Sequence, residues 1–160
     1  MEKIAIFVDV QNIYYTCRDG FQANFDYNKF WAKITKNKQV VKAIAYATYR
    51  NDEKQKQFQN ILRAIGFEVK LKNFITRSDG SSKGDWDVGI AIDVLEYASE
   101  VDKVILASGD GDFDLLMSKI KQKYKVKTEI YGVKDLTADS LIEASDKFYA
   151  IDKSLLITKK

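Results

Sequence analysis

Short apolar runs alternate along the chain with segments whose apolar residues recur every three or four positions. The apolar and alternating runs predict strands over residues 3–9, 40–49, 67–75, 101–107 and 125–131. The helical spacing predicts helices over residues 26–36, 52–65, 85–99, 113–123 and 137–144. Residues 76–84 read as a loop, and the segment from Lys147 is compatible with one more short strand. Strands and helices therefore alternate over most of the chain.

This alternation predicts an α/β fold, a three-layer sandwich around a central parallel sheet. Strands separated by helices pair in parallel through right-handed crossovers, which place helices on both faces of the sheet. The length of 160 residues suits one domain with its own core. We find no internal repeat or linker-like stretch, so residues 1–160 are interpreted as a single domain. Ligands of such sheets bind outside the carboxyl ends of the strands.

Composition removes several kinds of chemistry. The chain has no histidine and no proline, and Cys17 is its one cysteine. Histidine general bases, Ser-His triads, His-ligated metals, cysteine zinc clusters and internal disulfides are therefore excluded. No apolar run is long enough for a signal peptide or a membrane span. We expect a cytoplasmic protein that does not enter membranes.

Aspartates follow two of the predicted buried strands. Asp9 ends the first strand, and Asp110 stands just past the strand over residues 101–107. If those two strands are neighbours, both carboxylates face one crevice at the carboxyl edge of the sheet. Asp112 and Asp114 continue the run, and the intervening glycines permit a sharp turn that would bring these carboxylates together.

A third group of acids opens the helix predicted over residues 85–99. Asp85 and Asp87 lie at its start, and Asp93 lies among apolar residues, which suggests partial burial. Residues 79–114 hold ten acidic and only two basic residues in a chain of net charge +3. Clustered carboxylates repel one another unless a cation neutralises them. Without His or Cys, such a set favours Mg²⁺ or Mn²⁺.

Each aspartate taken alone has a structural explanation as well. An acid in a first helical turn complements the helix dipole, which suffices for Asp87. Asp110 and Asp112 could cap the following helix, and Asp9 could be a strand-end turn residue. The convergence of strand ends, a helix start and a Gly-Asp-Gly-Asp turn favours a metal site over these separate explanations.

Three motifs together resemble the NYN domain, in the LabA-like branch of the PIN-like nuclease superfamily. They are Phe7-Val8-Asp9-Val10-Gln11-Asn12, Lys83-Gly84 with Asp87-Val88 and Asp93, and Ser108-Gly109-Asp110-Gly111-Asp112-Phe113. The resemblance runs in order from about residue 3 to about residue 150. It implies a PIN-like fold with strand order 3-2-1-4-5, and metal-dependent hydrolysis of RNA phosphodiester bonds.

The resemblance also implies roles for individual residues. The catalytic set corresponds to Asp9, Asp87, Asp110 and Asp112, and the candidate ligands of Mg²⁺ or Mn²⁺ are these four and Asp114. Asn12 and Ser108 would support the carboxylates by hydrogen bonds, and Asp93 matches an acidic position of variable role. Asp85-Trp86 resembles a small insertion in the family pattern, which leaves open whether Asp85 or Asp87 faces the metal; Asp87, which is followed by Val88, fits better. With no histidine available, we expect a metal-activated water as the nucleophile.

Basic and aromatic residues flank the acidic motifs and are candidates for RNA contacts. They are Tyr14, Tyr49, Arg50, Arg77 and Lys83. Bases of single-stranded or looped RNA stack on aromatic rings while Lys and Arg follow phosphates. The alternative is a solvated surface for the basic residues and an ordinary core position for Tyr14.

Other functions fit less well. The turn after the first strand lacks the Gly-x-Gly-x-x-Gly of dinucleotide-binding folds. Gln11 stands where a haloacid-dehalogenase-like phosphatase needs a second aspartate, and Asp9 where a Toprim site usually has glutamate. The serious alternative is a non-catalytic PIN-like module that binds RNA or another protein. The edge strand over residues 67–75 leaves a homo-oligomer possible.

Overall fold

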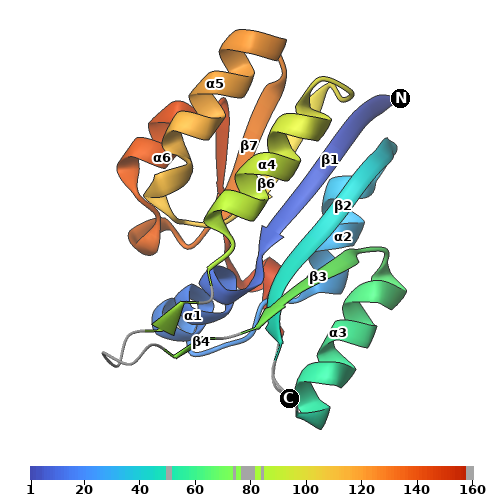
Figure 1. Cartoon of the computed structure of the whole chain (residues 1–160), viewed down its shortest axis with the longest axis vertical. Coiled ribbons are helices and arrows are strands. Elements are labelled where there is room, and N and C mark those ends of the chain that lie inside the picture. Colours follow the sequence, from blue (N-terminus) through green and yellow to red (C-terminus); the bar gives the residue numbers. More distant parts are fainter. Residues whose placement is uncertain (50–51, 74, 77–81, 84, 158–160) are drawn as a thin grey trace.

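The computed structural model describes residues 1–49, 52–73, 75–76, 82–83 and 85–157, and within 73–84 only backbone. A six-stranded sheet in the order β3-β2-β1-β6-β7-β8 forms its centre, and every pair of neighbouring strands in it is parallel. Helices cover both faces of the sheet, as Figure 1 shows. The predicted three-layer α/β sandwich is therefore confirmed.

At least one helix separates each strand of the central sheet from the next along the chain. The strands of the central sheet are β1 (Glu2–Asp9), β2 (Lys38–Tyr49), β3 (Glu68–Asn73), β6 (Lys103–Ala107), β7 (Lys127–Gly132) and β8 (Lys147–Ala150). The helices are α1 (Val10–Phe21), α2 (Tyr27–Thr35), α3 (Glu53–Ile65), α4 (Asp87–Ala98), α5 (Asp114–Tyr124) and α6 (Asp139–Ala144). Short 3-10 turns occupy Gly111–Phe113, Lys134–Leu136 and Lys153–Leu155.

Strand β1 lies at the centre of the sheet and is buried on both faces. Its alternate side chains divide between two cores: Ile4, Ile6 and Val8 pack under α1, α2 and α3, whereas Ala5 and Phe7 pack under α4, α5 and α6. This division follows from the period of two in a strand. It explains why the central strands appear in the sequence as continuous apolar runs rather than as alternating ones.

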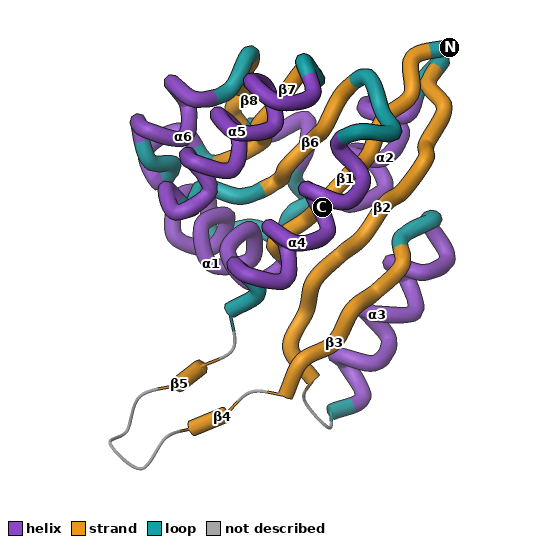
Figure 2. Tube along the Cα trace, turned by 45° about the horizontal axis from the view of Figure 1, so that its top comes forward, coloured by secondary structure: helices purple, strands orange, loops and turns teal. Residues whose placement is uncertain are grey.

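The expected strand order 3-2-1-4-5 is confirmed, with β6 and β7 as strands four and five. Beyond them β8 adds a sixth strand, where the sequence from Lys147 was compatible with one. Strand β3 lies at the edge, as its alternating pattern predicts, but it ends at Asn73. The segment predicted as one loop contains a short antiparallel pair, β4 (Ile75–Thr76) and β5 (Ser82–Lys83), which forms a separate small sheet (Figure 2).

The amino ends of the central strands carry paired charges. Lys103 Nζ lies 3.1 Å from Glu2 Oε1 and 3.0 Å from Glu129 Oε2, and Lys38 Nζ lies 2.8 Å from Glu2 Oε1. The acids at this edge are therefore neutralised by lysines. Among the described residues, no helix combines the length and the apolar character needed to cross a bilayer.

Gly66 ends α3 in a conformation that other residues rarely adopt. Its φ is 140°, and a Cβ added there would lie 2.6 Å from an atom of the Trp31 ring. We expect Gly66→Ala to lower the free energy of unfolding by about 1–3 kcal/mol, because it adds backbone strain and displaces a packed ring. Urea unfolding measures this difference.

Lys54→Ala serves as the matched control for Gly66→Ala, since Lys54 is an exposed residue in the first turn of the same helix. It should change the free energy of unfolding by less than about 0.5 kcal/mol. Equal effects of the two substitutions would contradict the structural role given to Gly66.

Candidate metal centre

The candidate site lies at the carboxyl edge of the sheet, where β1 and β6 are neighbours. Val8 pairs with Ala107, so the residues that follow these two positions leave the sheet side by side. Asp9 is the last residue of β1, and Asp110 lies three residues beyond the end of β6. The parallel pairing therefore brings together two aspartates that are about a hundred positions apart in the sequence.

Asp9 is held by hydrogen bonds from both sides of the crevice. Its side chain is 8% exposed. Ser108 Oγ donates to Asp9 Oδ2 at 3.2 Å, and the backbone N–H of Asn12 donates to Asp9 Oδ1 at 3.4 Å. Asp9 is also the N-cap of α1, so the strand end and the helix start fix one carboxylate.

The turn that carries Asp110 is fixed to the same elements. The N–H of Gly109 donates to Asn12 Oδ1 at 2.8 Å, and the N–H of Asp110 donates to Ser108 Oγ at 3.2 Å. A Cβ on Gly109 would lie 2.8 Å from the backbone oxygen of Leu136, so this position has no room for a side chain. Hydrogen bonds of Asn12 and Ser108 thus connect the ends of β1 and β6.

Asp87 reaches the site from the start of α4. The preceding residue, Trp86, anchors this helix start, because its Nε1–H donates to the backbone oxygen of Ala47 at 2.9 Å. The Trp86 ring also packs against Tyr46, with 5.3 Å between ring centroids. The first turn of α4 is thereby fixed over the carboxyl end of β2, beside β1.

Asp9, Asp87 and Asp110 form what we call the three-aspartate group. Each offers a carboxylate oxygen, and these oxygens lie within 4.8 Å of one another. None of the ion pairs between described residues includes any of the three. These three acids therefore have no ion-pair partner among the described residues, in contrast to Glu2 and Glu129 at the amino edge.

Burial and neighbouring carboxylates raise the pKa values of two of these acids. Burial raises the pKa of Asp9 to about 6, and the charges of Asp110 and Asp85 add to the rise, although hydrogen bonds from Asn12 and Ser108 oppose it. Burial also raises the pKa of Asp87 to about 7, with further contributions from the neighbouring Asp110, Asp85 and Asp9. A cation bound among these carboxylates would relieve both the desolvation and the repulsion.

The three-aspartate group fits a small divalent ion. Mg²⁺ takes oxygen ligands at about 2.1 Å in an octahedron, so opposite ligands lie about 4.2 Å apart. Oxygens within 4.8 Å of one another can share such an ion after a small movement of the side chains. The donors are all carboxylate oxygens, a set that suits Mg²⁺ or Mn²⁺.

The other acids of the two motifs lie outside the three-aspartate group. Asp112 is exposed, and its backbone N–H donates to Asp110 Oδ1 at 2.9 Å. Asp114, in the first turn of α5, is partly buried. Asp85 is exposed, and its Oδ1 accepts a hydrogen bond from the N–H of Asp87 at 3.3 Å. Between Asp85 and Asp87, the structure brings only Asp87 into the group.

Asp93 has partners away from the three-aspartate group. It is 8% exposed, and its Oδ2 accepts hydrogen bonds from Tyr46 Oη and Lys70 Nζ, both at 2.8 Å. The partial burial predicted from its apolar neighbours is confirmed. Lys70 thereby neutralises Asp93 and fixes the central part of α4 to β2 and β3.

The candidate RNA contacts have different surroundings. Tyr14 is 50% exposed and Tyr49 is 44% exposed, so Tyr14 is a surface residue rather than a core one. Arg50 and Arg77 lie outside the described residues, and of Lys83 only the backbone is described, in β5. Sequence reasoning did not single out Gln55 and Phe58 on α3, which line a pocket together with Tyr14. The only signal in the sequence was that Gln55 and Phe58 place an amide and an aromatic ring on one face of a predicted helix.

Comparisons with known proteins identify the family of the chain. The model of the NYN domain family matches residues 3–152, nearly the whole chain. The chain therefore belongs to the NYN domain family, for which nuclease-type chemistry, RNA binding and a divalent metal are the general expectation.

Two relatives cover most of the chain. The low amplitude and bright protein LabA of Synechococcus elongatus is 25% identical over 155 residues, which are 91% of this chain and 82% of LabA. A crystal structure of a protein of unknown function, VPA0982 from Vibrio parahaemolyticus, has 58% identity and a TM-score of 0.94. That alignment covers 98% of this chain and 96% of VPA0982.

A more distant likeness concerns the fold alone. Ribokinase from Giardia lamblia is 14% identical with a TM-score of 0.50, over 92% of this chain and 57% of the ribokinase chain. At this identity the shared feature is the layered α/β arrangement.

The raised pKa values predict how stability depends on pH in metal-free protein. Aspartates of the unfolded chain ionise near 3.8, whereas Asp9 and Asp87 ionise at about 6 and about 7 in the folded state. The folded state therefore binds more protons than the unfolded state between these values, so stability should fall as the pH rises from about 4 to about 7. Urea unfolding in EDTA across this range measures the slope.

Asp9→Asn should reduce this slope, because it removes one of the two carboxyls responsible. Asp19→Asn is the control, since Asp19 is an exposed residue of α1 outside the three-aspartate group, and it should leave the slope unchanged. A slope identical in wild type and Asp9→Asn would contradict the assignment.

Metal binding should appear as stabilisation of the folded protein. An ion that binds only the folded state at a hundred times its dissociation constant adds about 2.7 kcal/mol to the free energy of unfolding. We expect Mn²⁺ at millimolar concentration to raise the melting temperature of the wild type and of Asp19→Asn, but not of Asp110→Asn. Differential scanning fluorimetry measures the shift, and no shift in the wild type would count against the site.

Proposed function

We propose that the protein is a ribonuclease that hydrolyses RNA phosphodiester bonds with Mg²⁺ or Mn²⁺ held by the three-aspartate group. The observation that carries this proposal is a set of three close carboxylates at the carboxyl edge of the sheet, with no ion-pair partner among the described residues, in a chain of the NYN family. Two of these acids have raised pKa values, so the site favours the arrival of positive charge.

The roles of the residues follow from their positions. Asp9, Asp87 and Asp110 would hold the ion, and Asp112 and Asp114 would reach it through water. When bound, the ion would supply a water of lowered pKa and a positive charge for the phosphate. Ser108 and Asn12 keep the carboxylates of Asp9 and Asp110 in place through the hydrogen bonds described above.

The charge distribution supports a phosphodiester substrate. Residues 79–114 are strongly acidic, yet the whole chain has a net charge of +3, so the remainder is basic. Basic surface attracts the phosphate backbone of a nucleic acid, while the ion neutralises the acids at the reacting phosphate. The exposed rings of Tyr14 and Tyr49 offer surfaces on which unpaired bases can stack. These features favour single-stranded or looped RNA.

Cleavage of RNA should depend on both the metal and the three-aspartate group. A labelled RNA that contains a single-stranded segment and a hairpin is incubated with the protein in Mg²⁺, Mn²⁺ or EDTA. We expect cleavage in either metal and none in EDTA. Asp110→Asn should lower the rate by at least about 100-fold, because loss of a metal ligand should exceed the effect of losing a supporting partner. Gel analysis of the products measures the rate.

Asp19→Asn is the matched control and should cleave like the wild type. Binding of RNA without cleavage, unchanged by EDTA, would contradict the nuclease and would instead support the non-catalytic RNA-binding module. Cleavage that persists in Asp110→Asn would point to a contaminating nuclease or to a different active site.

A further inference from the structure

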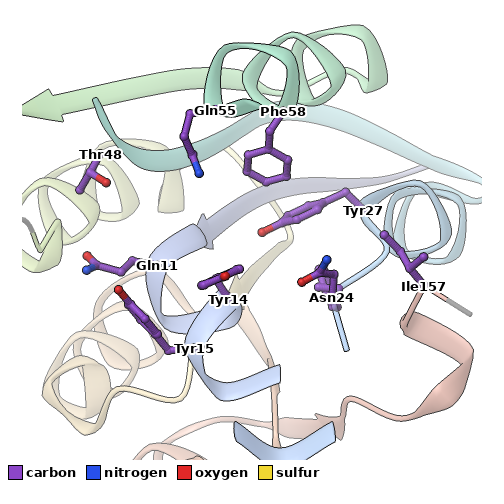
Figure 3. Close-up of a pocket in the computed structure, with 10 residues that line it drawn as sticks. Gln11, Tyr14, Tyr15, Asn24, Tyr27, Thr48, Gln55, Phe58 and Ile157 are labelled. Carbon is purple, nitrogen blue, oxygen red and sulfur yellow. The ribbon is translucent and has the colours of Figure 1, made fainter. Parts of the chain in front are cut away.

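A pocket of about 460 Å³ lies next to the three-aspartate group, between α1, α3 and the carboxyl end of β2. Figure 3 shows its walls, with Gln55 and Phe58 of α3 on one side and Gln11, Tyr14 and Tyr15 of α1 on the other. The volume falls within the range of pockets that hold small organic groups. None of the metal candidates lines it, so it is a separate compartment at the same edge of the sheet.

Aromatic rings make up much of the wall. Tyr14 and Tyr15 are half exposed and pack edge to face, with 5.4 Å between ring centroids. Tyr27 and Phe58 form a second pair with 5.6 Å between ring centroids. Tyr14, Tyr15 and Phe58 thus offer an entering planar group aromatic surface from two different helices.

The described polar side chains of the wall are neutral and form no hydrogen bonds with one another or with other described residues. Among the described residues that line the pocket, none carries a charge. The amide side chains of Gln11, Asn24 and Gln55 line it, and no hydrogen bond joins them to a described residue. An amide offers both a donor and an acceptor, which is the pattern that the edge of a nucleobase requires. Among the described residues of these walls, a phosphate or a carboxylate would find no counter-charge.

The pocket and the three-aspartate group are close in space. Gln11 follows Asp9 by two residues, so their Cα atoms are no more than about 8 Å apart. Thr48 lines the pocket two residues beyond Tyr46, which pairs with Asp9 across β1 and β2.

We propose that this pocket, hereafter the base pocket, holds one unpaired nucleobase of an RNA whose adjoining phosphate lies at the three-aspartate group. The inference rests on the proposed function and adds to it how the substrate is positioned. The two sites bind chemically different parts of one nucleotide. The three-aspartate group and its ion bind the charged phosphate, and the rings and amides of the base pocket bind the neutral planar base. A paired base could not enter, because its edge would already be occupied, so the base pocket selects single-stranded segments.

A thermodynamic cycle tests the base pocket without relying on cleavage. It combines a substitution in the pocket with removal of the bases from the RNA. Binding is measured by fluorescence anisotropy in the Asp110→Asn background, so that the RNA stays intact. The two probes are a single-stranded RNA hexamer and a ribose-phosphate hexamer that carries no bases. We expect Tyr14→Ala to weaken binding of the RNA hexamer about tenfold, the size of one lost stacking contact, and to change binding of the abasic chain less than about twofold. The difference between the effects of Tyr14→Ala on the two probes is the coupling, and it isolates the contact between the Tyr14 ring and a base.

Three further variants define the contact. Tyr14→Phe keeps the ring and should restore binding to within about twofold of the parent. Phe21→Ala removes an aromatic side chain of similar exposure from the same helix, outside the base pocket, and should leave both probes unaffected. Gln55→Ala should weaken binding of the RNA hexamer but not of the abasic chain.

The outcomes separate this inference from the proposed function. If Tyr14→Ala weakens binding of both probes equally, or of neither, the base pocket is wrong even when the wild type cleaves RNA in Mn²⁺. If the coupling is found but the wild type does not cleave, the base pocket stands and the nuclease does not. Failure of the parent to bind the RNA hexamer at all would overturn the base pocket.

Discussion

Repulsion among three unpaired carboxylates is the constraint on which the functional edge of this protein depends. Asp9, Asp87 and Asp110 offer oxygens within 4.8 Å of one another, and no described lysine or arginine pairs with them. At the opposite edge of the same sheet, Lys103 lies between Glu2 and Glu129, so the acids there are neutralised within the fold. The fold thus concentrates negative charge where parallel strands end, in an arrangement that could hold a divalent cation.

The carboxylates remain together because rigid elements hold them. Asp9 belongs to the central strand, which is buried under helices on both faces, and Asn12 and Ser108 connect its end to the end of β6. The turn at Gly109 packs against the backbone of Leu136, so the connection after β7 supports the acidic turn from outside. The unfavourable energy of the three-aspartate group is therefore offset by packing and hydrogen bonds elsewhere, as is common at functional sites.

Two chemically different sites lie at this edge of the sheet. The three-aspartate group is charged and suited to an ion and a phosphate, whereas the neighbouring base pocket is lined by rings and neutral amides. Strand β1 leads into both, because Asp9 belongs to one and Gln11 to the other. A nucleotide bound across them would be oriented by its two chemically distinct ends. Asp93, although prominent in the sequence, lies outside the three-aspartate group, and its carboxylate accepts hydrogen bonds from Lys70 and Tyr46.

The sequence by itself determined the layered α/β fold and the positions of Asp9 and Asp110 at the ends of strands, because apolar runs and helical periodicity are local patterns. The strand order came from the resemblance of three motifs to the NYN domain, and not from these patterns. Only the tertiary structure decided that Asp87 joins Asp9 and Asp110 while Asp112, Asp114 and Asp85 stay outside the group. It alone revealed the pair of Lys70 with Asp93 and the pocket between α1 and α3. The reason is physical. Contacts between residues distant in the chain depend on helix rotation and on side-chain direction, and the spacing of residues along the sequence does not specify either of them.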